Sequence, residues 1–313
     1  MGIIPIFRKE IGDHLGSRRF VILMVLIVLA SVSATYVAAQ SIQADLTQHP
    51  DQSFVFLRLF TASNGSLPGF ASFVAFLGPL LGVAFGFDAI NSEQSRGTLG
   101  RLLSQPIYRD NVINGKFLAG LATISVSLLA IYLLVSGLGL RMIGVPPSEE
   151  EIVRLAIFFV ISVFYVGFWL ALSTLFSLLT RQAATSALGA LSVWLFMAIF
   201  VTIVSGLVAS AFFPTNDNSP VQQVLDNRTL QQNIARVSPS NLYEEATEAI
   251  LSPDVRTITP VLFSQAQGAV PGSLKLDQSL LLVWPDVTGV IALTVVCFGV
   301  AYAMFMRQEI RTL

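Results

Sequence analysis

The chain has 313 residues, of which 54% are hydrophobic and only 12% are charged, with a formal net charge of -1 at pH 7. Soluble domains carry about 25% charged residues, so this composition and a mean hydropathy of +0.72 exclude a water-exposed fold for most of the chain. The balanced charge offers no basic surface to nucleic acid, and one cysteine with two histidines is too few for a disulfide framework or a soft-metal cluster. The totals predict a polytopic membrane protein.

The N-terminal stretch, residues 1–19, carries apolar side chains at helical spacing with charged residues between them. These apolar residues are Ile4, Phe7, Ile11 and Leu15. The pattern predicts a short amphipathic helix in the membrane interface. The first long apolar run begins only at Phe20 and is long enough to cross a bilayer, so we expect a retained span rather than a cleaved signal peptide.

Six apolar runs are each long enough to cross about 30 Å of hydrocarbon as a helix. They are residues 20–39, 70–90, 117–138, 152–179, 183–213 and 283–306. Arginine and lysine gather before the first run, between runs two and three, between runs four and five, and after run six. Because positive residues stay on the cytoplasmic side, we expect an all-α membrane fold with six transmembrane helices and both termini in the cytoplasm.

The expected organisation has five parts. They are an interfacial helix at 1–19, spans one to five at 20–213 with a cytoplasmic loop at 91–116 among them, an extracytoplasmic insert at 214–282, span six at 283–306, and a cytoplasmic tail at 307–313. The insert is polar and its stretch 238–253 predicts a capped helix, with Ser238 or Ser240 as N-cap and Pro253 after its end. We therefore expect a small, partly helical extracytoplasmic insert.

The loop between runs two and three, 91–117, is charged and rich in turn residues. A helix is expected over 93–105, ending before Pro106, because proline disfavours helical geometry in the preceding residue. Its apolar face consists of Leu99, Leu102 and Leu103. Such a helix can lie on the membrane or dock into a groove on another protein. With only three lysines in the whole chain, a protein partner is favoured; the alternative is a solvated loop resting on its own bundle.

The same loop carries a family resemblance. Glu93, Gly97, Thr98 and Leu99 form the pattern E-x-x-x-G-T-L, LLSQPIYR follows at 102–109, and Gly115-Lys116 precedes the next run. In this order the residues resemble the loop between spans two and three of ABC-2 type transporter permeases. The most similar subgroup is the multicopper-enzyme-maturation type, related to the permease of nitrous-oxide reductase maturation. With the N-terminal helix, the six spans and the outer segment, the resemblance covers essentially the whole chain.

The resemblance implies a permease subunit of an ABC exporter in a prokaryotic cell membrane. A separate ATPase subunit would bind ATP and Mg²⁺, and a second permease copy, identical or different, would complete the assembly among membrane lipids. The loop helix would be the coupling helix that docks into the ATPase, with Glu93 pairing with a basic residue of that partner or capping the helix, and Gly97 permitting close approach. The candidate coupling residues are Glu93, Arg96, Gly97, Thr98, Leu99, Leu102, Leu103, Pro106 and Arg109.

No enzymatic site is expected in the chain itself. A Walker A motif requires G-K-[ST], but Phe117 follows Gly115-Lys116. Both histidines, His14 and His49, lie outside the apolar runs, and neither H-E-x-x-H nor G-x-S-x-G occurs. No cofactor or metal site is expected, and the scattered sulfur and imidazole groups disfavour copper as substrate.

Span two carries a stripe of small residues. Gly78, Gly82 and Gly86 repeat every four residues, with Pro79 beside the first. Glycines at this spacing allow two helices to approach closely. They serve either helix packing within one bundle or a dimer interface or transport pathway.

Three charges lie near the ends of apolar runs: Asp88, Arg154 and Asp286. We interpret each as an interfacial charge that reaches water. Without a charge at mid-depth, an ion-coupled carrier is the least favoured function. The main alternative to the permease is a non-transporting membrane scaffold whose extracytoplasmic insert binds a partner protein. Asn64 and Asn227 begin N-x-S/T patterns typical of glycosylation acceptors.

Overall fold

The computed structural model describes residues 2–48, 54–63, 68–95, 97, 108–216, 219–253 and 274–307. Within these residues the chain is helical without strands, and six helical segments are long and apolar enough to cross a membrane. The elements are α2 (Arg18–Gln48), α4 (Phe70–Gly86), α7 (Arg109–Ile143), α8 (Glu149–Leu179), the run of α9 (Ala183–Leu195), the π-helix η1 (Phe196–Phe200) and α10 (Val201–Phe212), and α14 (Leu276–Arg307). The predicted all-α fold with six spans is confirmed.

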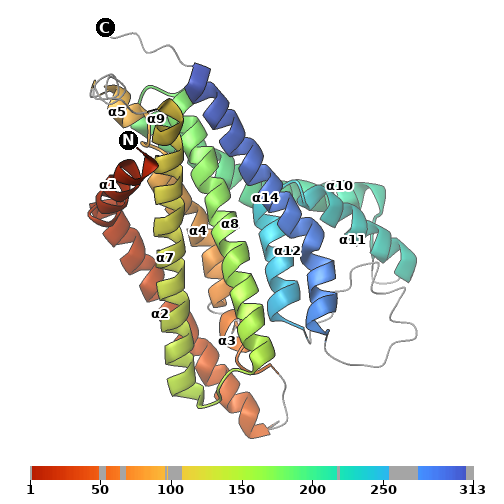
Figure 1. Cartoon of the computed structure of the whole chain (residues 1–313). Helices are drawn as coiled ribbons and strands as arrows, with labels where there is room; N and C mark the ends of the chain where they lie inside the picture. The colour runs from red at the N-terminus through yellow and green to blue at the C-terminus, as the bar shows by residue number, and fades with distance from the viewer. Residues whose placement is uncertain are drawn as a thin grey trace.

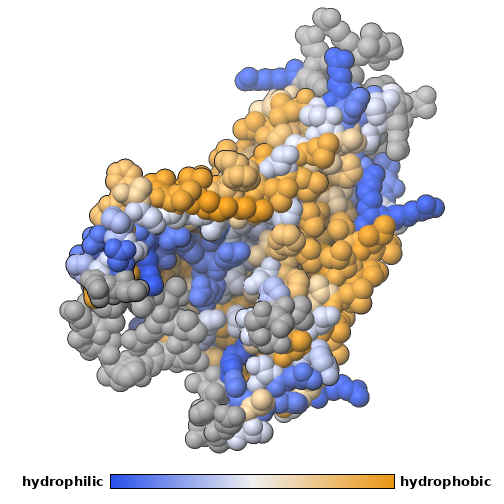
Figure 2. Space-filling model, turned by 180° about the vertical axis from the view of Figure 1, so that it is seen from behind, coloured by the Kyte–Doolittle hydropathy of each residue, from blue (hydrophilic) through white to orange (hydrophobic). Residues whose placement is uncertain are grey.

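The N-terminal helix α1 (Ile3–Leu15) lies at the same end of the bundle as the last turn of α14 (Figure 1). We call this the termini end. The short helix α5 (Asn91–Ser95) also lies there, whereas α3 (Arg58–Thr61) lies at the opposite end. Figure 2 shows an apolar band across the middle of the molecule with hydrophilic residues toward both ends. That distribution is expected of a protein that crosses a bilayer.

The glycine stripe of α4 packs directly against α8. A Cβ atom on Gly82 would lie 2.6 Å from the main-chain oxygen of Val166, and one on Gly86 would lie 2.7 Å from that of Leu170. At Gly78 the added atom would be 2.9 Å from the side chain of Val166. The stripe therefore lets two helices of one bundle approach closely, in keeping with the packing interpretation.

The segment expected to form the insert contains α11 (Val221–Ala235) and α12 (Pro239–Leu251). The helix predicted over 238–253 is found as α12, which begins after Ser238, but the Ser238 side chain makes no capping hydrogen bond, so the predicted serine cap is wrong. α12 packs against the membrane helices. Its buried side chains, which belong to the core shared with α8 and α14, are Leu242, Tyr243, Ala246 and Ile250. By contrast, α10 and α11 form an arm that projects sideways (Figure 1).

The arm is apolar along the side that faces the termini end and hydrophilic on the other side (Figure 2). Asn227 lies between its two helices, where its side-chain amide donates to the main-chain oxygen of Phe213 at 2.7 Å. Burial and this bond make Asn227 a poor glycosylation acceptor. Asn64 lies outside the described residues.

Two charges that were expected to reach water are buried. Arg154 is 0% exposed and Asp286 only 4%. Asp286 lies 3.6 Å from Arg236, which also pairs with Glu245 at 3.0 Å. The prediction that Arg154 and Asp286 reach water was wrong. Each residue lies near the end of an apolar run in the sequence, but α12 and its neighbours pack over it in the fold. Asp88 behaves as expected: its side chain is 26% exposed and pairs with Arg19 on α2 at 2.7 Å.

Arg154 joins three elements near the opposite end of the bundle. Its guanidinium donates to the main-chain oxygens of Ile250 at 3.0 Å and Leu274 at 2.7 Å, and to the hydroxyl of Ser279 at 3.1 Å. The carboxylate of Glu150, one helical turn away, pairs with it at 2.8 Å. We call these five residues the Arg154 cluster. They fix the end of α12 and the start of α14 to α8.

Candidate functional site at the termini end of the bundle

The site begins with the packing of α1 on α7. Ile6 and Glu10, one turn apart, are the buried residues of α1. Ile6 lies over Gly115, where an added Cβ atom would come within 2.9 Å of its side chain. Glycine at that position therefore allows α1 to approach α7 closely, and the next turn places Glu10 beside Lys116.

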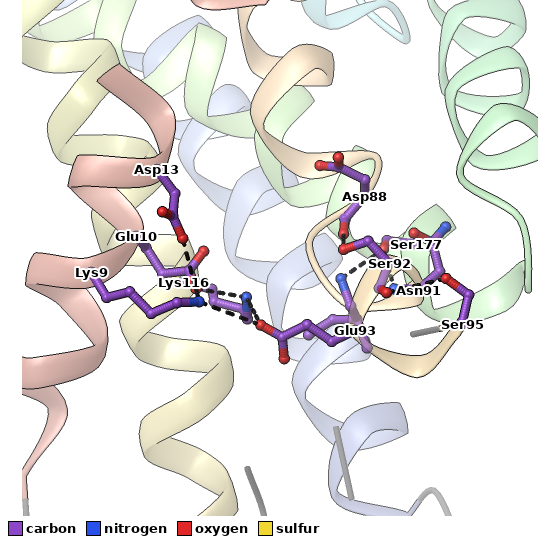
Figure 3. A network of polar contacts seen from close by, with 11 residues as sticks. Lys9, Glu10, Asp13, Asp88, Asn91, Ser92, Glu93, Ser95, Lys116 and Ser177 are labelled. Carbon is purple, nitrogen blue, oxygen red and sulfur yellow. Dashed lines mark hydrogen bonds and ion pairs between the residues drawn. The ribbon is translucent and has the colours of Figure 1, made fainter. Parts of the chain in front are cut away.

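Lys116 lies between two carboxylates from different helices (Figure 3). Its Nζ atom is 2.9 Å from Oε1 of Glu10 on α1 and 2.8 Å from Oε1 of Glu93 on α5. The lysine is only 7% exposed. Lys9 adds a second cation, 3.1 Å from Glu10 and 3.3 Å from Asp13. We call Lys9, Glu10, Asp13, Glu93 and Lys116 the Lys116 cluster.

Glu10 and Lys9 each stabilise the charged form of the other. Burial by itself would raise the pKa of Glu10, but Lys116 and Lys9 outweigh that effect and hold the pKa below its ordinary value of 4.5. Burial would likewise lower the pKa of Lys9, but the carboxylates of Glu10, Glu93 and Asp13 raise it above 10.5. Because charged hydrogen bonds with little solvent around them are strong, the cluster holds α1, α5 and α7 together.

α5 is also attached to α8. The hydroxyl oxygen of Ser177 accepts hydrogen bonds from the main-chain N–H groups of Ile90 at 2.9 Å and Asn91 at 3.1 Å. Asn91 is fully buried, and its side-chain amide donates to the main-chain oxygen of Phe87. The turn that carries Glu93 is therefore fixed from two sides, by α8 and by the Lys116 cluster (Figure 3).

Three of the predicted coupling residues lie within the described part of the chain. Glu93 pairs with Lys116 of its own chain at 2.8 Å. The pairing of Glu93 with a basic residue of the ATPase stays a prediction. The continuous helix predicted over 93–105 is wrong, because α5 ends at Ser95 and Gly97 has φ of +67°, a left-handed conformation that favours glycine. Arg109 is the first residue of α7. The remaining residues lie outside the described part: Arg96, Thr98, Leu99, Leu102, Leu103 and Pro106.

Sequence reasoning missed Glu10 and Lys116 as functional residues. One signal was available, because Glu10 follows Ile6 by four residues and so shares its face of the amphipathic helix. Lys116 stands at the start of an apolar run, where a lysine needs either water or a carboxylate. Neither observation identifies the partner, since the two residues are 106 positions apart.

Within the described residues, six membrane-length helices, an amphipathic N-terminal helix and a charged cluster at one end of the bundle define a polytopic helical membrane protein. The sequence model of the ABC-2 family transporter protein matches residues 4–310, and the chain belongs to that family. The resemblance found in the sequence is thereby confirmed.

Two curated relatives agree with this assignment. The chain is 29% identical over 214 residues to "Probable ABC transporter permease protein NosY" of Stutzerimonas stutzeri, over 65% of this chain and 69% of that protein. It is 30% identical over 199 residues to the protein of the same name in Pseudomonas aeruginosa, over 62% of this chain and 66% of that protein. The chain is thus a multi-pass ABC transporter permease subunit of the cell membrane, a type of protein that works with an ATPase subunit.

Proposed function

We propose that this permease is half of an exporter, in which two permease copies work with separate ATPase subunits that bind ATP and Mg²⁺. The termini end faces the cytoplasm, because the segments at that end carry most of the arginine and lysine. The described parts of the loop at 91–117, α5 and the first turns of α7, lie at the same end, and the loop docks on the ATPase. The chain itself provides the membrane path and no catalytic group.

The observation that carries this proposal is the ion pair across the base of the loop. Glu93 lies on α5 near the start of the loop, Lys116 lies on α7 near its end, and their side chains meet at 2.8 Å. Glu10 ties the same lysine to α1. A displacement of the loop by the ATPase would therefore move three helices together, because the buried ion pairs resist separation.

The first test is gentle purification of the tagged chain from its native membrane, followed by mass spectrometry. A stoichiometric partner with a G-x-x-x-x-G-K-[ST] motif is expected. A preparation that contains only an extracytoplasmic partner would overturn the permease proposal and favour the scaffold.

The second test replaces Leu99, Leu102 and Leu103 with serine in the reconstituted complex. Loss of the three apolar side chains should separate ATP hydrolysis from the permease, so that ATPase activity no longer responds to the presence of the permease. The matched control replaces the same three leucines with methionine, which keeps the apolar face and should keep the response. An unchanged response in the serine variant would contradict docking through this face.

A further inference from the structure

A side chain of α8 completes the hydrogen bonding of α4. Pro79 lies inside α4 and has no N–H group, so the main-chain oxygen of Ala75, four residues earlier, lacks its helical donor. The hydroxyl of Tyr165 donates to that oxygen at 2.7 Å. Tyr165 is fully buried, and its ring lies next to Gly78, where no side chain stands in the way.

The same hydroxyl reaches α12. Its oxygen lies 3.1 Å from the hydroxyl oxygen of Ser240, and because the tyrosine proton is donated to Ala75, the serine is the donor in this second bond. The rings of Tyr165 and Tyr243 stack at 4.2 Å with an interplanar angle of 11°. One buried side chain therefore binds α4 and α12 together.

This bridge has a second anchor on α8. The hydroxyl of Tyr243 lies 2.8 Å from that of Ser162, which in turn is 2.7 Å from the hydroxyl of Tyr132 on α7. All of these side chains are buried, so a broken bond leaves a polar group without water to replace its partner. Small shifts of α4 are then more readily passed to α12 than absorbed between them.

We propose that Tyr165 is the positioning residue that makes α4 and α12 move together, so that a displacement of the loop at 91–117 reaches α12. α4 continues into α5 and the loop, whereas α12 ends near the opposite end of the bundle, where Arg154 holds it. The inference rests on the proposed function, because it needs an ATPase that moves the loop.

The test follows the accessibility of α12 in the complete complex of permease and ATPase in lipid nanodiscs. Cys297 is the single cysteine, so Cys297→Ala gives a background into which Glu248→Cys, on the exposed side of α12, adds one reporter. The labelling rate with a charged maleimide is measured without nucleotide and after trapping with ATP and vanadate. The rate should change on trapping. Tyr165→Phe should reduce this ATP-dependent change by about tenfold while ATP hydrolysis continues.

Further variants separate bridging from local stability. Pro79→Ala restores an N–H donor for Ala75, so a purely local role of Tyr165 predicts that Pro79→Ala rescues Tyr165→Phe, whereas bridging predicts no rescue. Ser240→Ala cuts only the contact with α12 and should also reduce the change. As matched control, Thr174→Val removes a buried hydroxyl that bonds the Leu170 oxygen of its own helix, and should leave the change intact.

The outcomes distinguish this inference from the function on which it rests. Normal ATP-dependent labelling in Tyr165→Phe, or rescue by Pro79→Ala, overturns the bridge while the permease proposal stands. If the wild-type permease stimulates the ATPase but the labelling rate at residue 248 does not change on trapping, the bridge is likewise overturned and the permease proposal stands. A permease that neither binds nor stimulates an ATPase overturns the proposed function, and the bridge with it.

Discussion

Two buried cations hold opposite ends of the bundle, and each joins the two sides of a loop. Lys116 binds Glu93 across the loop at 91–117, whereas Arg154 binds the main-chain oxygens of Ile250 and Leu274 on either side of residues 254–273. Lysine meets carboxylates from separate helices, while arginine meets mainly carbonyl and hydroxyl oxygens. The first junction consists of ionisable partners, whereas the second has only one, Glu150.

The difference agrees with what each junction has to do. An ammonium group is a compact charge whose contacts can lengthen and re-form, which suits helices that shift together with a docked partner. A guanidinium group offers five donors in a rigid fork and stays protonated, which suits a fixed joint. Arg154 therefore fixes α12 in place, whereas the contacts of the Lys116 cluster can lengthen and re-form when the helices shift.

The largest expected effect comes from Arg154→Met. It removes a fully buried cation and leaves the carbonyls of Ile250 and Leu274 without their donor, which should cost about 3–5 kcal/mol. The measurement is thermal unfolding in detergent, with Arg141→Met as control for an exposed arginine on α7. If Arg154→Met were as stable as Arg141→Met, the Arg154 cluster would not be what fixes α12 to α8.

A smaller loss is expected for Lys116→Met, about 2–3 kcal/mol, because Glu10 and Glu93 are left close together in a poorly solvated site but retain Lys9 nearby. The loss should appear as reduced hydrogen-exchange protection of α1. Lys9→Met is the matched control: its side chain is 58% exposed, so at most about 1 kcal/mol is expected. Equal losses in both variants would show that the buried position of Lys116 is unimportant.

Acid should weaken the Lys116 cluster more than the Arg154 cluster, in which Glu150 is the single carboxylate. Folding lowers the pKa of Glu10, so its contribution to stability is present above the ordinary value of 4.5 and is lost as the pH falls through the lowered pKa. Three of the four partners of Arg154 are main-chain or hydroxyl oxygens, which carry no charge that acid could remove. Burial and the neighbouring Glu248 raise the pKa of Glu244 on α12, so protonation there does not weaken that helix.

The measurement is hydrogen exchange of α1 and α12 between pH 7 and about 3, corrected for intrinsic rates. Protection of α1 should fall with acid before that of α12. A parallel loss in both helices would contradict the distinction between the two junctions.

The smallest effect is expected at the exposed pair of Arg19 and Asp88. The two side chains are 54% and 26% exposed, so Arg19→Met should lower stability by about 0.5–1 kcal/mol or less, including its contact over the ring of Phe87. The effect should shrink in high salt, measured by the same thermal unfolding. If Arg19→Met lowered stability as much as Lys116→Met does, solvent exposure would not explain the difference between the exposed and the buried ion pairs.

The sequence by itself predicts the spans, α1 and α12 well. Span length follows from the length of an apolar run, and α1 from the spacing of its apolar residues. The helix predicted over 238–253 is found at Pro239–Leu251, because prolines act on their immediate neighbours. The family follows from a local pattern, E-x-x-x-G-T-L, and is confirmed.

Only the tertiary structure decided which of these residues meet. Glu10 and Lys116 are 106 positions apart and Arg154 and Leu274 are 120 apart, so no local pattern links them. The same reason explains the error at Arg154 and the pairing of Glu93 with Lys116, which the sequence did not predict: whether a charge is solvated or buried depends on which helices pack over it. Hydrophobicity and local geometry fix each helix, but the partner of a buried charge is set by the packing of all of them.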